Sequence, residues 1–397
     1  MILRNRRFYL CLIGLLFCVV AILSSGFAQF GAEEQPFLVQ RARVIAVEDP
    51  RLSPDPYVQG LYIGRQTVEV EIISGEFAGQ RVRFENTLSR FFNFPAEAGM
   101  ELLVSVMPHF ETGEISHVDI FGHSRSAFLY ILIGLFLLIL LVIGRKKGLY
   151  SAISLAFTLV TIVFFMIPFI LRGHSPVLFA VLAAVLTTIF STFLVGDISL
   201  KSIAAIGGTL VGVVSAGIIS VLAGHFARLS GLQLPNAEDV ILGAPDGVFI
   251  RIHELLFAGI IIAALGAVMD VSMSIASSVF EVKQASPKMN AKKLYRSGMR
   301  VGGDIMGTMS NTLILAFAGT SITTLVVIAL SEFPYLRLIN LDMVGIEIIQ
   351  GLSASIGLIL AVPVTAILAS LLASHNKISK FLKTRAKVIE QEQTKAR

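Results

Sequence analysis

The sequence predicts a polytopic α-helical membrane bundle of about seven to eight spans, with a small extracytoplasmic β-barrel-like domain near the N-terminus. Three observations predict this class. The 397 residues have a mean hydropathy of +0.79 and 15% charged side chains, whereas soluble domains carry about 25%. Apolar runs long enough to cross a bilayer recur beyond residue 125. The polar stretch 31–124 instead alternates in the manner of β-strands.

Residues 1–30 have the pattern of a signal peptide or a signal anchor. Arg4, Arg6 and Arg7 precede an apolar run over residues 8–24, and small residues follow at Ser25 and Ala28. This is the order of a basic region, an apolar region and a signal-peptidase site. Cleaved or retained, the segment predicts that the next domain lies outside the cytoplasm.

The polar domain, residues 31–124, is expected to be a small β domain of the OB or SH3-like kind. Its strand-like stretches are bounded by Gly, Pro, Asn or Asp, which favour turns. Five short strands within about ninety residues are typical of a small barrel or open sandwich. The expected strands are residues 37–47, 67–73, 80–86, 101–107 and 114–121.

The multi-pass domain is expected to cover residues 125–375, followed by a basic cytoplasmic tail, 376–397. With residues 8–24 as the first span, the others are predicted at 127–143, 151–171, 177–195, 202–223, 255–282, 302–330 and 345–373.

The distribution of basic residues predicts the orientation of these spans. Lys and Arg gather in the N-terminus, the tail and three loops on the same side, at 145–147, Lys201 and 283–300. The loops between spans on the other side hold only four arginines, Arg172, Arg228, Arg251 and Arg337. The positive-inside rule therefore places the C-terminus in the cytoplasm, with the protein in the plasma membrane. The N-terminus is cytoplasmic too if the first span is not cleaved.

Several motifs give the chain a family resemblance. Leu265–Val271 reads LGAVMDV and Gly302–Leu315 reads GGDIMGTMSNTLIL; Gly144–Gly148 (GRKKG) and Gly173–Pro176 (GHSP) add to the pattern. In this order and spacing they resemble the YibE/F-like bacterial membrane proteins over about 35–375. Gly303 departs from the family pattern, where a larger, often basic residue is expected. The resemblance implies class and topology and leaves the activity open.

Asp270 is the main candidate for a functional site because it lies within an apolar run. A carboxylate at the centre of a membrane helix costs about 2.5–3.5 kcal/mol and is a functional candidate by default. Gly259, Gly266 and Ser274 fall on its helical stripe. On the next span Asp304, Thr308 and Asn311 share a face. Asp270 and Asn311 both lie about 16 Å from the cytoplasmic boundary at ~1.5 Å per residue, so we expect an oxygen-ligand cluster for a proton or small cation.

Helix packing is the competing interpretation of these polar and small residues. Ser, Thr and Gly stripes in membrane helices most often serve close contacts and interhelical hydrogen bonds. Packing is therefore favoured for Ser274 and Thr308, while capping of a helix N-terminus competes for Asp304. The expected helix-packing glycines are Gly208, Gly212, Gly259 and Gly266.

Three functions remain open from the sequence. The first is a transporter or channel-like protein for a small solute or ion. The second is a non-catalytic assembly or sensing protein whose outer β domain binds a protein partner. A remote third is an intramembrane aspartyl protease using Asp270 and Asp304, disfavoured because they differ in depth by about 10 Å.

The sequence gives no support for an enzyme, a metal-binding protein or a nucleic-acid-binding protein. The sequence contains no P-loop, Rossmann fingerprint or nucleophile elbow, so no enzyme activity and no cofactor is expected. Cys11 and Cys18 are the only cysteines and have neither zinc nor disulfide-framework spacing, so no metal is expected. The basic residues mark topology, which makes the lipid bilayer the expected surroundings and excludes nucleic acid as a partner.

Overall fold

The computed structural model describes residues 14, 16–18, 37–109, 114–234, 236–245 and 247–374. The chain divides into two compact units, Ala28–Val142 and Met1–Phe27 with Ile143–Arg397. The basic tail and most of the predicted signal segment lie outside the described residues.

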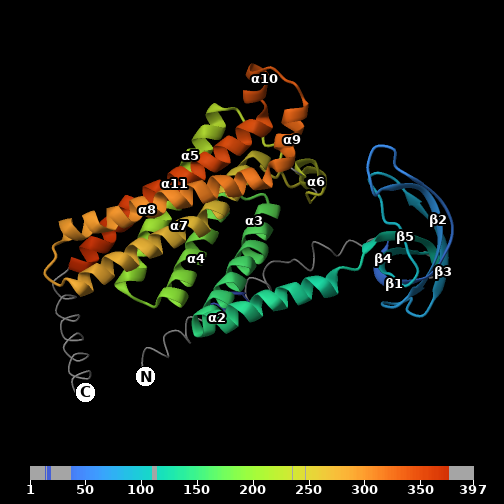
Figure 1. Ribbon diagram of the computed structural model, residues 1–397, viewed down its shortest axis with the longest axis horizontal. Coiled ribbons are helices and arrows are strands. Elements are labelled where there is room, and N and C mark those ends of the chain that lie inside the picture. Colours follow the sequence, from blue (N-terminus) through green and yellow to red (C-terminus); the bar gives the residue numbers. More distant parts are fainter. Residues whose placement is uncertain are drawn as a thin grey trace, which may run out of the picture. The chain divides into compact units, whose positions relative to one another are not determined.

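The N-terminal unit contains a five-stranded antiparallel sheet that forms a half-barrel (Figure 1). Its strand order is β3-β2-β1-β4-β5, so β3 and β5 are the edges. The strands are β1 (Leu38–Pro54), β2 (Tyr62–Ile72), β3 (Arg81–Leu88), β4 (Glu101–Pro108) and β5 (Ile115–His123). Each expected strand is present.

The first strand is longer than expected because β1 passes through a bulge. Asp49 and Pro50 predict a turn, yet pairing with β2 resumes at Arg51 after a register shift from Glu48. A bulge accommodates a residue that cannot donate to the ladder. Alternating side chains of the sheet then form a core that includes Val44, Val68, Val70, Leu102, Val104 and Val106.

The second unit consists of helices. The chain enters it through α2 (Ser126–Val160), continues as a π-helix, η1 (Thr161–Met166), and ends this run in α3 (Ile167–Leu171). The following helices are α4 (Pro176–Gly196), α5 (Leu200–Phe226), α6 (Ala237–Leu242), α7 (Ile252–Ala285), α8 (Ala291–Thr320), α9 (Ile322–Leu330), α10 (Tyr335–Ile339) and α11 (Asp342–Ser374).

Local sequence signals explain where several helices begin and break. Ser175 caps α4, which has Pro176 in its first turn, and Asn290 caps α8 by accepting a hydrogen bond from the Lys293 backbone N–H over 3.0 Å. The run Ser126–Leu171 contains one residue with non-helical backbone angles, Arg145 (φ 48°, ψ −124°). This break separates two stretches that the sequence predicts as different spans.

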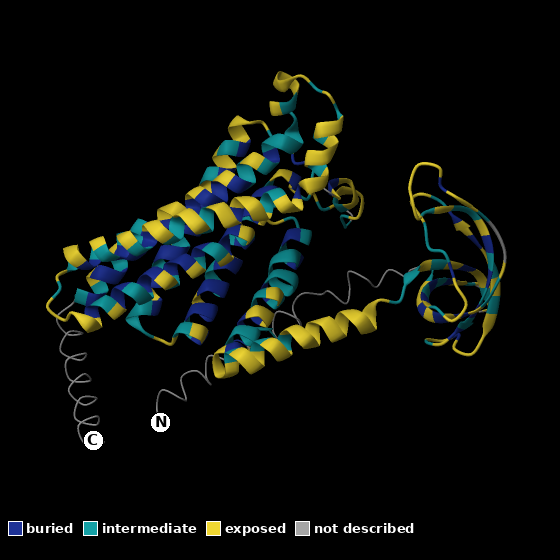
Figure 2. Cartoon of the chain, viewed as in Figure 1, coloured by how far each residue is buried: buried dark blue, intermediate teal, exposed yellow. Residues whose placement is uncertain are grey.

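Helix α7 is the centre of the bundle. It packs against α4, α5, α8 and α11. Its buried side chains include Ile260, Val268, Val271 and Ile275, and buried residues are gathered inside the helical bundle (Figure 2). Helices α5 and α11 approach closely, because Gly212 lies against Gly357 and Ala361. The small residues of these helices thus allow their backbones to meet.

The span expected at residues 302–330 is bent. Helix α8 begins earlier, at Ala291, and meets α9 at an angle of 62° at Ser321. The hydroxyls of Thr320 and Ser321 both donate to the Phe317 carbonyl, which competes with the regular helical ladder.

By length and composition, the described residues contain five helices able to cross a membrane, or six if α8 and α9 form one span.

Candidate functional site

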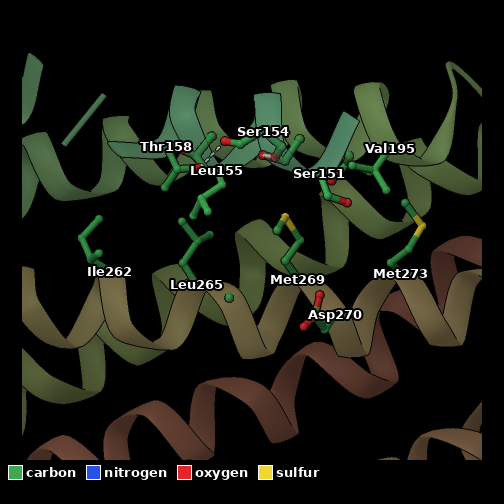
Figure 3. Close-up of a pocket in the computed structure, with 14 residues that line it drawn as sticks. Ser151, Ser154, Leu155, Thr158, Val195, Ile262, Leu265, Met269, Asp270 and Met273 are labelled. Carbon is green, nitrogen blue, oxygen red and sulfur yellow. Dashed lines mark hydrogen bonds between the residues drawn. The ribbon is translucent and has the colours of Figure 1, made fainter. Parts of the chain in front are cut away.

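Asp270 lies near the middle of α7 and lines a pocket of about 410 Å³ (Figure 3). The other walls come from α2 beyond Arg145 and from α4. The polar lining consists of the Asp270 carboxylate and six hydroxyls, those of Ser151, Ser154, Thr158, Thr187, Ser191 and Thr192. The pocket therefore combines a single acidic group and several hydroxyl-bearing residues with a lining that is otherwise apolar.

The hydroxyls differ in how far their hydrogen-bonding capacity is used. Ser154 Oγ donates to Ser191 Oγ over 2.5 Å, and Thr158 Oγ1 donates to the Ser154 carbonyl over 2.9 Å. Thr192 is only 2% exposed, and its Oγ1 has no hydrogen-bond partner within the described ranges. A buried hydroxyl without a partner costs about 1–3 kcal/mol. Because Thr192 Oγ1 is enclosed by protein atoms, a pocket ligand would not contact it, whereas Ser151 is half-buried and belongs to the accessible lining.

Asp270 likewise has no protein partner in the part of the chain that the structure describes: it forms neither an ion pair nor a hydrogen bond. Its side chain is exposed rather than sealed among other helices, so it remains accessible from the pocket. Uncompensated intramembrane carboxylates are expensive and usually pair with a basic group or face a hydrated cavity. Asp270 is therefore available to bind a cation.

The remaining walls are apolar. Leu155, Val195, Ile262, Leu265 and Met273 line the pocket around the oxygen atoms, together with Met269. Apolar walls lower the local dielectric and strengthen the attraction between a carboxylate and a bound cation. The arrangement combines one negative charge, neutral oxygen ligands and a low-dielectric surround, which suits a small monovalent cation.

The expected pairing of Asp270 with Asn311 is not seen in this pocket. α7 contacts α8 through Ile275 and Val279, which face Gly302 and Gly298. Nine residues separate Asp270 from Val279, which at 3.6 residues per turn places them on opposite sides of α7. Asp270 and Asn311 therefore do not meet even at matching depth. The Asp270 side chain lies on the side of α7 that faces away from α8.

The α8 candidates, Asp304, Thr308 and Asn311, are all exposed and absent from the pocket lining. Asp304 does not cap α8 either, because the helix begins at Ala291, more than three turns earlier. Thr308 Oγ1 donates to the Ile305 carbonyl of its own helix. These three residues form a separate polar face rather than part of the Asp270 site.

Comparison with known proteins gives a family match that lies mostly in the helical unit. A family described as YibE/F-like protein matches residues 132–375. The chain belongs to the YibE/F-like family. Neither the curated proteins nor the solved structures contain a significant match. The matched region begins within α2 and includes every residue of the Asp270 pocket.

The glycines of this YibE/F-like chain divide into two groups. A Cβ at Gly212 would lie 2.7 Å from Ala361 Cβ and Val268 Cγ1, and one at Gly208 would overlap Thr365. A Cβ at Gly259 or Gly266 would meet nothing within 4 Å. The first pair therefore lies at close helix contacts, while the second pair lies on the exposed stripe of α7 and packs against no other helix.

Ser274 continues that exposed stripe, one turn from Asp270, without lining the pocket. The sequence analysis did not predict that hydroxyl side chains of α2 and α4 would line the Asp270 pocket. Ser151, Ser154 and Thr158 have i, i+3, i+7 spacing, and α4 carries two hydroxyl pairs in adjacent turns. That periodic signal marks one polar face on each helix, and it could have identified α2 and α4 as partners of the Asp270 helix.

Proposed function

We propose that this YibE/F-like protein crosses the plasma membrane eight times, with the β domain outside the cytoplasm. The run Ser126–Leu171 has 46 residues, about 69 Å of helix against a hydrocarbon core of about 30 Å, so it is long enough for two spans divided at Arg145. Counting α8–α9 as one bent span and residues 8–24 as the first gives eight. The basic residues at 145–147 and 283–300 favour a cytoplasmic location for those loops.

We propose further that the protein transports a small monovalent cation through the Asp270 pocket. The proposal rests on the unpartnered Asp270 carboxylate, which lines the same pocket as six hydroxyl-bearing side chains. A cation would replace part of its hydration shell with the carboxylate and with an accessible hydroxyl oxygen such as that of Ser151. Protonation of the carboxylate would weaken this binding, which gives the site a means of release coupled to protons.

The test is flux in proteoliposomes that contain the full chain and a cation- or pH-sensitive dye. We expect flux of one monovalent cation with the native protein and none with Asp270→Asn, which removes the charge and preserves the shape. Ser151→Ala should raise the half-saturating cation concentration about tenfold, because it removes an oxygen ligand with little change in side-chain volume. Glu281→Gln on the same helix lies outside the pocket and should leave the flux unchanged.

Two outcomes contradict transport through this site. One is equal flux with native protein and Asp270→Asn when both insert normally. The other is no flux of Na⁺, K⁺ or protons with the native protein under either sign of membrane potential.

A second candidate function, partner binding by the β domain, is favoured by a group of exposed aromatic side chains. Tyr57, Phe91 and Phe92 are 82%, 92% and 70% exposed, and the Arg90 guanidinium lies 5.0 Å from the Tyr57 ring centroid. Aromatic and Arg side chains are enriched at protein interfaces. Photo-crosslinking from position 91 in living cells should capture one dominant protein, whereas an exposed control position, Glu76, should not.

A further inference from the structure

A row of basic side chains runs along one face of the first part of α8. Lys292, Arg296 and Arg300 follow one another at intervals of four residues, and all three are exposed. Four residues advance about 6 Å along a helix and return to nearly the same side of it. Lys293 lies beside these residues and is exposed as well. Lys292, Arg296 and Arg300 are called the basic row below.

The basic row faces away from the rest of the helical bundle. The opposite face of α8 packs through Leu294, Gly298 and Gly302, which are all buried. A Cβ at Gly298 would lie 2.7 Å from Val279 of α7, and one at Gly302 would overlap Val362 of α11. Helices α7 and α11 therefore cover one face of α8, and the basic row lies on the face that the bundle leaves open to its surroundings.

The positive charge of the basic row is not neutralised within the part of the chain that the structure describes. None of its three residues forms an ion pair there, even with Glu281 of α7 or Asp304 of α8, the acidic residues that flank the row in the sequence. Helix α8 also has no acidic residue in its first turn. Three positive charges along about 12 Å of helix thus remain available to an anionic partner.

The place of the basic row in the chain identifies that partner. Arg300 is the last basic residue of α8, and the helix then continues into the apolar part that, with α9, is long enough to cross a membrane. We infer that the basic row binds the phosphate groups of anionic phospholipids where α8 enters the bilayer. Lys and Arg side chains next to a membrane helix attract anionic lipids, and their hydrogen bonds to phosphate are strengthened by charge. The inference rests on the proposed placement of α8 in the membrane and not on transport.

The orientation of the basic row supports lipid binding over a mere topology signal. The positive-inside rule depends on how many Lys and Arg residues a loop contains and makes no demand on the direction in which they point. Here all three residues lie on the outward face of α8, opposite the face that packs on α7 and α11. Lipid headgroups next to the bundle can therefore approach all three cations at once.

Quenching of an introduced tryptophan by brominated lipid tests this site. The chain contains no Trp, so Gly303→Trp reports on one place, three residues beyond Arg300, where a Cβ would meet nothing within 4 Å. The full chain is reconstituted in mixtures of phosphatidylglycerol and phosphatidylcholine, with either lipid brominated in turn. Anionic phosphatidylglycerol should bind near the reporter at least about tenfold more tightly than phosphatidylcholine. The matched reporter Gly259→Trp on α7, equally open and distant in sequence from the basic row, should show no preference.

Two triple variants of the Gly303→Trp protein separate the basic row from general charge. Replacing all three residues of the row by Gln should abolish the preference for phosphatidylglycerol. The control variant removes the same charge from exposed lysines of the two connectors proposed to be cytoplasmic, and it should keep the preference; its substitutions are Lys146→Gln, Lys147→Gln and Lys288→Gln.

Three results would overturn the inference. They are equal binding of the two lipids beside an intact basic row, a preference that survives loss of the row, and equal losses of preference in both triple variants. A second reporter, Gly307→Trp on the same face of α8, should give the same result and guards against a local disturbance at position 303. Both leaflets contain both lipids and no flux is measured, so the result depends neither on the proposed orientation nor on the transport proposal.

Discussion

Ser154 Oγ of α2 donates a hydrogen bond to Ser191 Oγ of α4 over 2.5 Å, and this contact joins two walls of the Asp270 pocket. The rings of Phe157 and Phe190 stack nearby with centroids 3.9 Å apart, Phe157 one turn after Ser154 on α2 and Phe190 directly before Ser191 on α4. The hydroxyl pair therefore adds a hydrogen bond to a contact between α2 and α4 that is otherwise apolar. It also leaves the Ser191 proton free to donate toward a pocket ligand.

Ser154→Ala should accordingly weaken the α2–α4 contact. Interhelical hydrogen bonds in membranes average about 0.6 kcal/mol, so we expect a loss of about that size in the free energy of unfolding. Unfolding in mixed detergent micelles measures this loss. Ser278→Ala is the control, because the Ser278 hydroxyl bonds only to the Ser274 carbonyl of its own helix. Equal losses in both variants would show that the pair contributes nothing specific.

Gly212→Ala should destabilise the bundle at a close contact between α5 and α11. The new methyl group would lie 2.7 Å from Ala361 Cβ and Val268 Cγ1 and 2.9 Å from the Gly357 carbonyl oxygen, so α5 and α11 must separate. Overpacking of this kind costs about 1–3 kcal/mol. The thermal midpoint of aggregation in detergent should fall for Gly212→Ala and stay unchanged for Gly259→Ala. A Gly212→Ala protein as stable as the native one would contradict the packing described.

The hydrophobic periodicity of the sequence was sufficient to predict the strands and helices, but it did not predict which of them would pack against one another. The five strands and the apolar helices follow from alternation and from run length, both of which are local properties of the sequence. The long β1 strand was not predictable in full, because Pro50 ends a strand unless a bulge absorbs it, and a bulge depends on the partner strand.

The candidate site shows the same division. Asp270 could be identified from the sequence, because a charge in an apolar run is conspicuous. The residues near Asp270 could not be identified in the same way. Residue counts give the depth of a side chain along its helix, but the direction in which it points matters only once the surrounding helices are known. Ile275 and Val279 face α8, which turns Asp270 toward α2 and α4 and leaves Asn311 on an outer face.

Acid should loosen the loop that follows β1. Asp55 accepts hydrogen bonds from Arg90 Nε over 2.6 Å and from the Tyr57 and Val58 backbone N–H groups. The Arg90 hydrogen bond, followed by these backbone bonds, holds the pKa of Asp55 below its ordinary value of 3.8. A lowered pKa in the folded state gives stability that is present above the ordinary pKa and is lost as pH falls through the folded value.

Hydrogen exchange over residues 55–61, corrected for the intrinsic rate, should therefore accelerate as pH falls below the ordinary value of 3.8. Arg90→Gln should show fast exchange already at pH 7. The exposed pair between Arg43 and Glu101 provides the control, and Arg43→Gln should leave exchange in this loop unchanged. Protection that persists in Arg90→Gln would mean that the backbone bonds alone hold the loop.

Lys283 should hold the connector between α7 and α8 closed. Its side chain is buried, and its ammonium group donates to the Pro287 carbonyl over 3.0 Å and to the Met289 carbonyl over 2.7 Å. Lys283→Met keeps the apolar stem and removes both bonds, so the connector should open more often. Limited trypsin digestion at the exposed Lys288 should then be faster than in native protein, while Lys292→Met should have no effect. The same cleavage also tests the orientation. Because the connector is proposed to be cytoplasmic, trypsin should cut at Lys288 in inside-out vesicles and should not cut in sealed right-side-out vesicles. Cleavage only in right-side-out vesicles would contradict the proposed orientation.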